Sequence, residues 1–282
     1  MKGKLYLCPT PIGNLGDITL RTLDVLKSVD LIAAEDTRVS SKLLKHFDIK
    51  VPTTSYYEHN KREKGSYLLE KLLTGENIAV ITDAGMPGIS DPGEDLVRLC
   101  IENEIEVEAL PGPCAFATAL VASGMPTGRF AFEGFLTVNR KNRLSHLESV
   151  KNDIRTLIFY EAPHKLLTTL KDMLDIFGDR EITLARELTK HYEEYRRTTL
   201  KEAINYYEEI PPKGEFVLII KGADEKKLIE EYRESLPPAE DLLRRYAAEN
   251  LRAKELTRRV ADELKLPRRE IYELYLKIKD TL

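Results

Sequence analysis

The chain has 282 residues, of which 42% are hydrophobic and 32% are charged, and its formal net charge is −4. This length exceeds one ordinary hydrophobic core, so we expect two domains and an appendage. The composition is that of a folded globular protein. No apolar run reaches the roughly 18 residues that cross a bilayer. No export signal precedes the first apolar run, so we expect a cytoplasmic protein without membrane contact.

The first part of the chain alternates between strand-like and helix-like patterns. Apolar runs of strand length occupy residues 4–9, 29–35, 77–82 and 105–110, and amphipathic stretches such as 20–28 and 67–73 separate them. This alternation predicts an α/β domain over residues 1–122 with a mostly parallel sheet. A helix expected at about 113–123 then meets Gly124, Pro126 and Gly128, a cluster that indicates a hinge.

A second α/β domain is expected over residues 123–224. It contains the apolar runs FAFEGFL, TLIFYE, EITLARE and GEFVLIIKG, with helical patterns between them. The alternating segment Tyr192 to Leu200 resembles a hairpin arm, which requires an antiparallel neighbour. We therefore predict a mixed sheet here.

The composition changes after Gly222, and we expect a small all-helical tail over residues 236–282. Residues 237–282 hold 11 Lys or Arg against 9 Asp or Glu, a charge of +2 that leaves −6 for the rest. A break at Pro267 between two helical patterns predicts a helix-turn-helix-like unit. A dimerisation or capping bundle explains the same pattern equally well.

Three turns rich in glycine and proline each follow a strand-like run: CPTPIGNLGD from Cys8, TDAGMPGISDPG from Thr82 and LPGPCA from Leu110. The carboxyl ends of parallel strands meet at one edge of a sheet, so these turns are expected to form one small-molecule site. None has the GxGxxG, GxxxxGK[ST] or GxSxG spacing, which disfavours a nicotinamide cofactor, a P-loop and a serine hydrolase. The three cysteines and five histidines lack metal-ligand spacing. An adenosyl-sulfonium fits such loops, although they could also be only tight turns.

Nine segments in chain order resemble the ribosomal RNA small-subunit methyltransferase I family, of the tetrapyrrole (corrin/porphyrin) methylase fold. They are PTPIGNLGDITLRTL, DLIAAEDTR, SYYEHN, ITDAGMPGISDPG, LPGPCA, FEGFL, LIFYEAPHKL, LARELTK and KGEFVLI. The resemblance extends to about residue 222. It implies two α/β domains, S-adenosylmethionine in the cleft between them, a homodimer, and methylation of a cytidine ribose 2′-oxygen in the decoding region of 16S RNA, either free or in the small ribosomal subunit.

The resemblance also implies which residues contact the methyl donor. They are Ile12, Gly85, Met86, Pro87, Ile89, Cys114, Ala115, Ala162 and Leu188. Family members commonly have threonine where Met86 stands, so only a backbone contact is expected there.

Methyl transfer to a hydroxyl requires alignment of the oxygen with the methyl group and removal of a proton. Polar candidates for these roles lie in the segments EDTR, EHN, YEAPH and ARELTK and at Glu133. Asp36 and His59 are the leading candidates for the proton acceptor or for orienting the substrate, and Glu35, Arg38 and Arg186 are expected beside them. Each could instead be structural, since such carboxylates often cap helices.

Basic residues at several places are candidates for phosphate contacts with RNA, although a solvated surface explains them nearly as well. They are Arg140, Lys141, Arg143, Lys190, Arg196, Arg197, Arg258, Arg259, Arg268 and Arg269. Two other functions stay open at this point. One is a C-methyltransferase of a corrin-type macrocycle, and the other is a non-catalytic ribosome-binding protein on the same fold.

Overall fold

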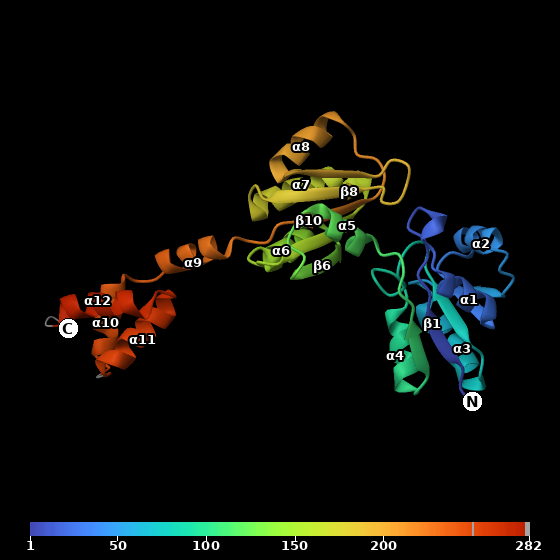
Figure 1. Ribbon diagram of the computed structural model, residues 1–282, viewed down its shortest axis with the longest axis horizontal. Helices are drawn as coiled ribbons and strands as arrows, with labels where there is room; N and C mark the ends of the chain where they lie inside the picture. Colours follow the sequence, from blue (N-terminus) through green and yellow to red (C-terminus); the bar gives the residue numbers. More distant parts are fainter. Residues whose placement is uncertain (250, 280–282) are drawn as a thin grey trace. The chain divides into compact units, whose positions relative to one another are not determined.

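The computed structural model describes residues 1–249 and 251–279 and divides the chain into two compact units. The larger unit, residues 1–150 and 155–221, contains two five-stranded sheets (Figure 1). The smaller unit joins residues 151–154 to residues 222–282. None of the helices in the described ranges combines the length and the apolarity that a bilayer crossing requires.

The first sheet is entirely parallel and has the strand order β3-β2-β4-β1-β5. Its strands are β1 (Lys4–Leu7), β2 (Leu31–Ala34), β3 (Thr53–Ser55), β4 (Ile78–Ile81) and β5 (Glu106–Ala109). The four strands expected from apolar runs are present. The fifth, β3, is three residues long and carries only Thr and Ser, so it has no apolar signal.

Four helices cover the two faces of the first sheet, and together they form the first lobe. They are α1 (Leu20–Ser28), α2 (Thr37–His46), α3 (Lys61–Thr74) and α4 (Glu94–Glu102), with a 3₁₀ turn at Leu15–Asp17. One core joins Leu68 of α3 and Leu96 of α4 to the sheet, and the other joins Leu26 of α1 and Leu44 of α2 to its opposite face. Burial on both faces explains why the parallel strands read as continuous apolar runs.

The second sheet is mixed and has the order β6-β7-β10-β8-β9. Its strands are β6 (Phe130–Phe135), β7 (Thr156–Glu161), β8 (Glu181–Arg186), β9 (Glu194–Thr199) and β10 (Phe216–Ile220). Strands β6 and β7 are parallel, and the other pairs are antiparallel. The expected hairpin arm is β9, which pairs with β8.

The second lobe consists of this sheet and the helices α5 (Ala115–Ser123), α6 (Arg140–Val150), α7 (Pro163–Phe177) and α8 (Leu200–Glu209). Helices α6, α7 and α8 share a core on one face of the sheet, and α5 packs on the other. The domain boundary expected between residues 122 and 123 therefore falls at the last turn of α5, whose apolar side chains lie in the second core.

The smaller unit contains α9 (Glu225–Glu234), α10 (Ala239–Ala247), α11 (Ala253–Leu264) and α12 (Arg268–Ile278). The last three helices pack around Leu243, Val260 and Ile271. Helix α11 is followed by its C-cap Lys265, whose φ of 49° is left-handed, and α12 begins directly after Pro267. The all-helical tail expected from the sequence is thus confirmed.

Candidate functional site

The three glycine- and proline-rich turns meet at one edge of the first sheet, because β4, β1 and β5 are adjacent there. Thr10, after β1, exchanges two backbone hydrogen bonds of 3.0 Å with Gly85, after β4. The Thr10 hydroxyl also donates to the Thr82 carbonyl at 3.0 Å. The third turn packs on the first so closely that a Cβ on Gly112 would lie 2.7 Å from the Pro9 side chain. The convergence expected from the sequence is confirmed.

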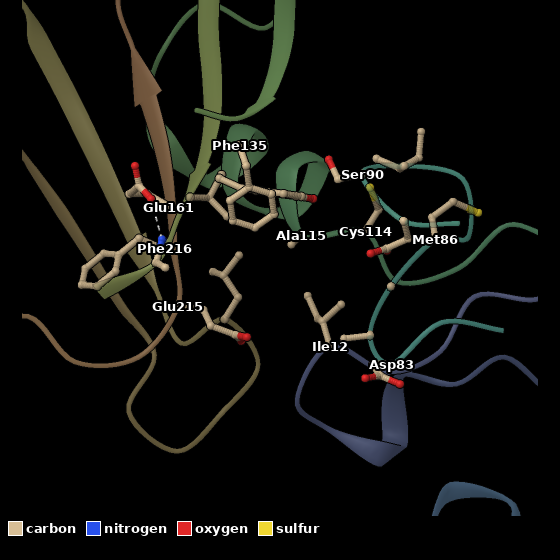
Figure 2. A pocket seen from close by; sticks show the side chains of 18 of the residues that line it. Ile12, Asp83, Met86, Ser90, Cys114, Ala115, Phe135, Glu161, Glu215 and Phe216 are labelled. Atoms are coloured by element: carbon tan, nitrogen blue, oxygen red, sulfur yellow. Dashed lines mark hydrogen bonds between the residues drawn. The ribbon is translucent and has the colours of Figure 1, made fainter. Parts of the chain in front are cut away.

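A pocket of about 330 Å³ opens beside these turns. Figure 2 shows Ile12, Asp83 and Met86 on its first-lobe side and Phe135, Glu161 and Phe216 on its second-lobe side. Eight of the nine residues expected at a methyl donor line it, and Pro87 does not. The eight are Ile12, Gly85, Met86, Ile89, Cys114, Ala115, Ala162 and Leu188.

The two lobes approach each other closely at Gly13, in the turn after β1. A Cβ at this position would lie 2.8 Å from the Thr189 hydroxyl and 3.0 Å from the Leu188 carbonyl oxygen, both in the turn after β8. Only glycine fits such an approach without moving backbone. The turn after β1 therefore lies close against the turn after β8 at this point.

Three carboxylates lie along the first-lobe wall of the pocket: Glu35, Asp83 and Asp91. The Glu35 carboxylate accepts a hydrogen bond from the Asp83 backbone at 3.3 Å, and that of Asp83 accepts one from the Asp36 backbone at 3.2 Å. Burial raises the pKa of both side chains. Burial, reinforced by the negative charges of Glu35 and Asp83, raises the pKa of Asp91 to about 7. Such a wall favours a cationic ligand.

The residues expected to take part in catalysis lie at different places relative to the pocket. Glu35 lines it. Asp36 is the N-cap of α2 and forms an ion pair with Arg38 at 2.7 Å, and the hydrogen bonds from Arg38 lower the pKa of Asp36 to about 2. His59 is exposed beside Tyr57, at a ring-centroid distance of 6.4 Å.

Arg186, the remaining candidate, lies at the end of β8. It forms an ion pair with Glu194 at 3.1 Å and donates to the Lys213 carbonyl at 3.4 Å. Asp36, Arg38, His59 and Arg186 are therefore outside the pocket lining.

Several candidates for RNA contact have structural partners in the second lobe. Lys190 lines the pocket and pairs with Glu187 at 2.9 Å and Glu215 at 2.8 Å. Arg197 donates to the Ala122 and Ser123 carbonyls at the end of α5. Arg196 pairs with Glu194 and lies 3.5 Å from the ring centroid of Tyr206.

Arg143 differs most from its expected role. Its side chain is only 7% exposed and forms an ion pair of 2.7 Å with the buried carboxylate of Asp172. It is thus a folding contact and not a phosphate contact. Its neighbours Arg140 and Lys141 are exposed, and Arg140 reaches the same aspartate at 3.3 Å.

The four arginines expected at RNA in the tail are all exposed. Three have acidic partners: Arg259 with Glu249 at 3.0 Å, Arg268 with Asp262 at 3.6 Å and Arg269 with Glu273 at 2.8 Å. Arg258 forms no ion pair within the part of the chain that the structure describes.

Sequence reasoning missed Asp83, Asp91 and Phe135 as pocket residues. The two aspartates stand inside the turn TDAGMPGISDPG, so a search for acidic residues in the turns themselves could have found them. Nothing in the sequence marks Phe135 as a pocket residue, because a phenylalanine in an apolar strand is expected to pack in the core.

Comparison with known proteins gives the same fold and a more specific relationship. The profile of the Tetrapyrrole (Corrin/Porphyrin) Methylases matches residues 4–204. A protein of Synechocystis sp. named Ribosomal RNA small subunit methyltransferase I is 49% identical over 278 residues, which is 98% of this chain and 99% of that protein. Its namesake in Bacillus subtilis is 45% identical over 97% of this chain and 94% of its own length.

Two solved structures share the fold at lower identity. Diphthine synthase matches with a TM-score of 0.61 at 10% identity, over 78% of this chain and 90% of its own. Uroporphyrin-III C-methyl transferase from Thermus thermophilus, complexed with S-adenyl homocysteine, matches with a TM-score of 0.55 at 20% identity, over 78% and 97%. From the profile and from the nearly full-length relatives, the chain belongs to the ribosomal RNA small subunit methyltransferase I family of tetrapyrrole methylases.

Proposed function

We propose that the protein transfers a methyl group from S-adenosylmethionine to the ribose 2′-oxygen of a cytidine in the decoding region of 16S ribosomal RNA. The observation that carries the proposal is the pocket between the lobes, in which apolar walls meet three carboxylates of raised pKa. Membership of the rRNA methyltransferase family supports the RNA substrate.

The pocket residues fit the chemistry of this methyl donor. Ile12, Met86 and Leu188 supply apolar contact area, and the wall of Glu35, Asp83 and Asp91 attracts the positive charge that distinguishes a sulfonium from a thioether. When bound, the donor supplies an electrophilic methyl group. The chain then has to orient the ribose oxygen and accept its proton.

We assign these two tasks to residues near the carboxyl ends of β2, β3 and β8. Glu35 faces the pocket, and Asp36 is joined to the pocket wall through its backbone bond to Asp83. Glu35, Asp36 and His59 are the proposed acceptor and orienting groups. Arg38 and Arg186 are the proposed anchors for the charged backbone of the substrate.

The proposal also includes contacts with RNA, assembly and location. The proposed phosphate contacts are the exposed Arg140, Lys141 and Arg197, the half-buried Lys190 and Arg196, and the four exposed tail arginines. The protein acts as a homodimer in the cytoplasm. Light scattering of the purified protein tests the dimer directly.

Radiolabelled S-adenosylmethionine provides the test of the function. The protein is incubated with free 16S RNA, with small ribosomal subunits that lack the modification, and with a tetrapyrrole precursor. Label on a cytidine 2′-oxygen, located by nuclease digestion and mass spectrometry, is the expected result. Label only in the macrocycle, or tight ribosome binding with no label anywhere, contradicts the proposal.

A further inference from the structure

Strand β6 has a β-bulge next to the pocket. Its pairing with β7 is regular up to Phe132 opposite Ile158, but the next pair is Gly134 opposite Phe159, so Glu133 is an extra residue. Gly134 has a φ of 66°, which a side chain would disfavour. The Glu133 carboxylate lies 2.8 Å from Nε2 of His146 on α6 and holds the extra residue in place.

The bulge changes the face of the sheet on which Phe135 lies. Regular alternation would put Phe135 on the same face as Ala131, in the core under α6 and α7. With the bulge, Phe135 instead pairs with Tyr160, whose ring lies 5.3 Å away on the pocket face. Phe135 therefore lines the pocket instead of packing in the core, and the residue is 55% exposed.

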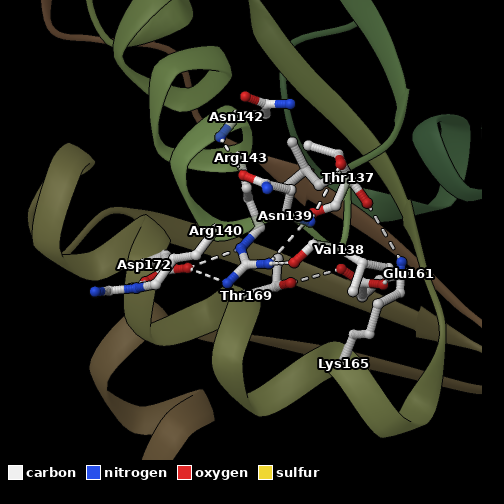
Figure 3. Close-up of polar contacts among 11 residues, drawn as sticks. Thr137, Val138, Asn139, Arg140, Asn142, Arg143, Glu161, Lys165, Thr169 and Asp172 are labelled. Carbon is white, nitrogen blue, oxygen red and sulfur yellow. Dashed lines mark hydrogen bonds and ion pairs between the residues drawn. The ribbon is translucent and has the colours of Figure 1, made fainter.

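Two ion pairs made with α7 fix the loop that follows Phe135. Lys165 pairs with the buried Glu161 at 3.0 Å and donates to the Leu136 carbonyl at 3.3 Å. Arg143, held by Asp172, donates to the carbonyls of Thr137 and Val138 at 3.2 and 3.1 Å (Figure 3). Exposed loops are usually mobile, so such a set of buried charges holds Phe135 and its loop in one position.

A cation beside this ring indicates which ligand the ring contacts: Lys165 Nζ lies 5.7 Å from the centroid of the Phe135 ring. Arg140 and Lys141 begin α6 a few residues beyond Phe135, and both are exposed. An exposed aromatic ring near cations is the arrangement that binds an unstacked nucleobase with its phosphates. Asp83, in the acidic wall that suits the methyl donor, lies across the pocket from Phe135 (Figure 2).

We infer that Phe135 is the stacking platform for the base of the nucleotide whose ribose is methylated. The bulge at Glu133 and Gly134 places the Phe135 ring on the pocket face, and the ion pairs of Arg143 and Lys165 fix the loop that follows it. The inference rests on the proposed function and adds to it how the target nucleotide is held.

The test compares variants of the full chain in methyl transfer to small ribosomal subunits at saturating S-adenosylmethionine. Phe135→Leu keeps apolar bulk but removes the aromatic face, so kcat/KM for the RNA falls by roughly tenfold or more. Phe135→Tyr keeps stacking and stays within about threefold of wild type. Phe130→Leu, on the same strand but outside the pocket, is the matched control and keeps wild-type kcat/KM.

Calorimetry with S-adenosylhomocysteine separates a base contact from a donor contact. The Kd of all three variants is expected to stay within about threefold of wild type. The inference is overturned if Phe135→Leu behaves like Phe130→Leu, or if its Kd weakens by the same factor as kcat/KM. If the wild-type protein methylates no RNA, the proposed function itself fails, and a normal Kd would then show an intact donor site.

Discussion

At the scale of single residues, Asp91 lowers the stability of the folded protein and in return favours binding of a cationic ligand. Its carboxylate lies in an apolar pocket near two other carboxylates, so ionisation is penalised and the pKa rises to about 7. A carboxylate in such a position destabilises the empty folded protein at neutral pH, and a cationic ligand compensates for this. Both consequences can be measured with Asp91→Asn.

We expect Asp91→Asn to stabilise the folded protein at pH 8 and to leave it unchanged at pH 4. The folded-state pKa is raised above the unfolded value of 3.8, so the native state loses stability as pH rises from about 4 through about 7. The amide removes that loss. Partial exposure screens the effect, so we expect about 1 kcal/mol at pH 8. Urea denaturation at both pH values measures it, and a variant less stable than wild type at pH 8 contradicts the assignment.

The same carboxylate predicts a pH dependence that differs between substrate and product. S-adenosylmethionine carries a sulfonium that favours ionised Asp91, whereas S-adenosylhomocysteine carries a neutral sulfur. The ratio of their affinities should therefore shift several-fold toward the sulfonium between pH 6 and pH 8. Calorimetry with both ligands tests this, and Asp91→Asn should reduce the change. An equal pH dependence for both ligands would show that the acidic wall does not contact the sulfur.

At the scale of elements, the turn after β1 fixes the distance between the lobes. Gly13→Ala would place a methyl group 3.0 Å from the Leu188 carbonyl oxygen and 2.8 Å from the Thr189 hydroxyl, so the two turns must separate. We expect S-adenosylhomocysteine affinity to fall about tenfold or more. Gly128→Ala is the control, because a Cβ there meets no atom within 4 Å. Wild-type affinity in Gly13→Ala would show that the pocket tolerates the separation.

The connection between α6 and α7 depends on a buried charge pair. Asp172→Asn leaves the Arg143 guanidinium buried without a counter-charge, which costs about 3 kcal/mol of unfolding free energy. Urea denaturation followed by circular dichroism measures the loss. Glu208→Gln breaks the exposed pair with Lys171 and should change stability by less than about 0.5 kcal/mol. Equal effects of the two substitutions would contradict the structural role of Arg143.

The elements also show how far the sequence could predict this molecule. Parallel strands force their carboxyl ends together, so the convergence of the turns at Thr10, Gly85 and Gly112 followed from the strand pattern alone. The position of Arg143 did not, because its partner Asp172 is 29 residues away and nothing local marks the pair. Likewise, one bulge residue decides whether Phe135 faces the core or the pocket. The alternation of residue types along β6 does not indicate this bulge.

At the scale of the whole molecule, the pocket residues all belong to the larger unit, and the relatively basic segment belongs to the smaller one. A ribosomal RNA substrate is far larger than the pocket, so its affinity depends on cations that the methyl donor never contacts. Substitutions in the two units are therefore expected to affect different binding steps. Changes in the tail should alter RNA binding and leave donor binding unchanged.

Arg258 gives the sharpest test of that separation, because it is exposed and free of ion pairs among the described residues. If it contacts a phosphate, Arg258→Ala releases about one counterion fewer on binding. The slope of log affinity against log salt concentration then becomes shallower by about 1. Lys226→Ala removes one exposed charge from α9 and should leave the slope unchanged. Filter binding to small ribosomal subunits across salt concentrations measures both. Identical slopes for wild type and Arg258→Ala would instead favour the tail as a capping or dimerisation bundle.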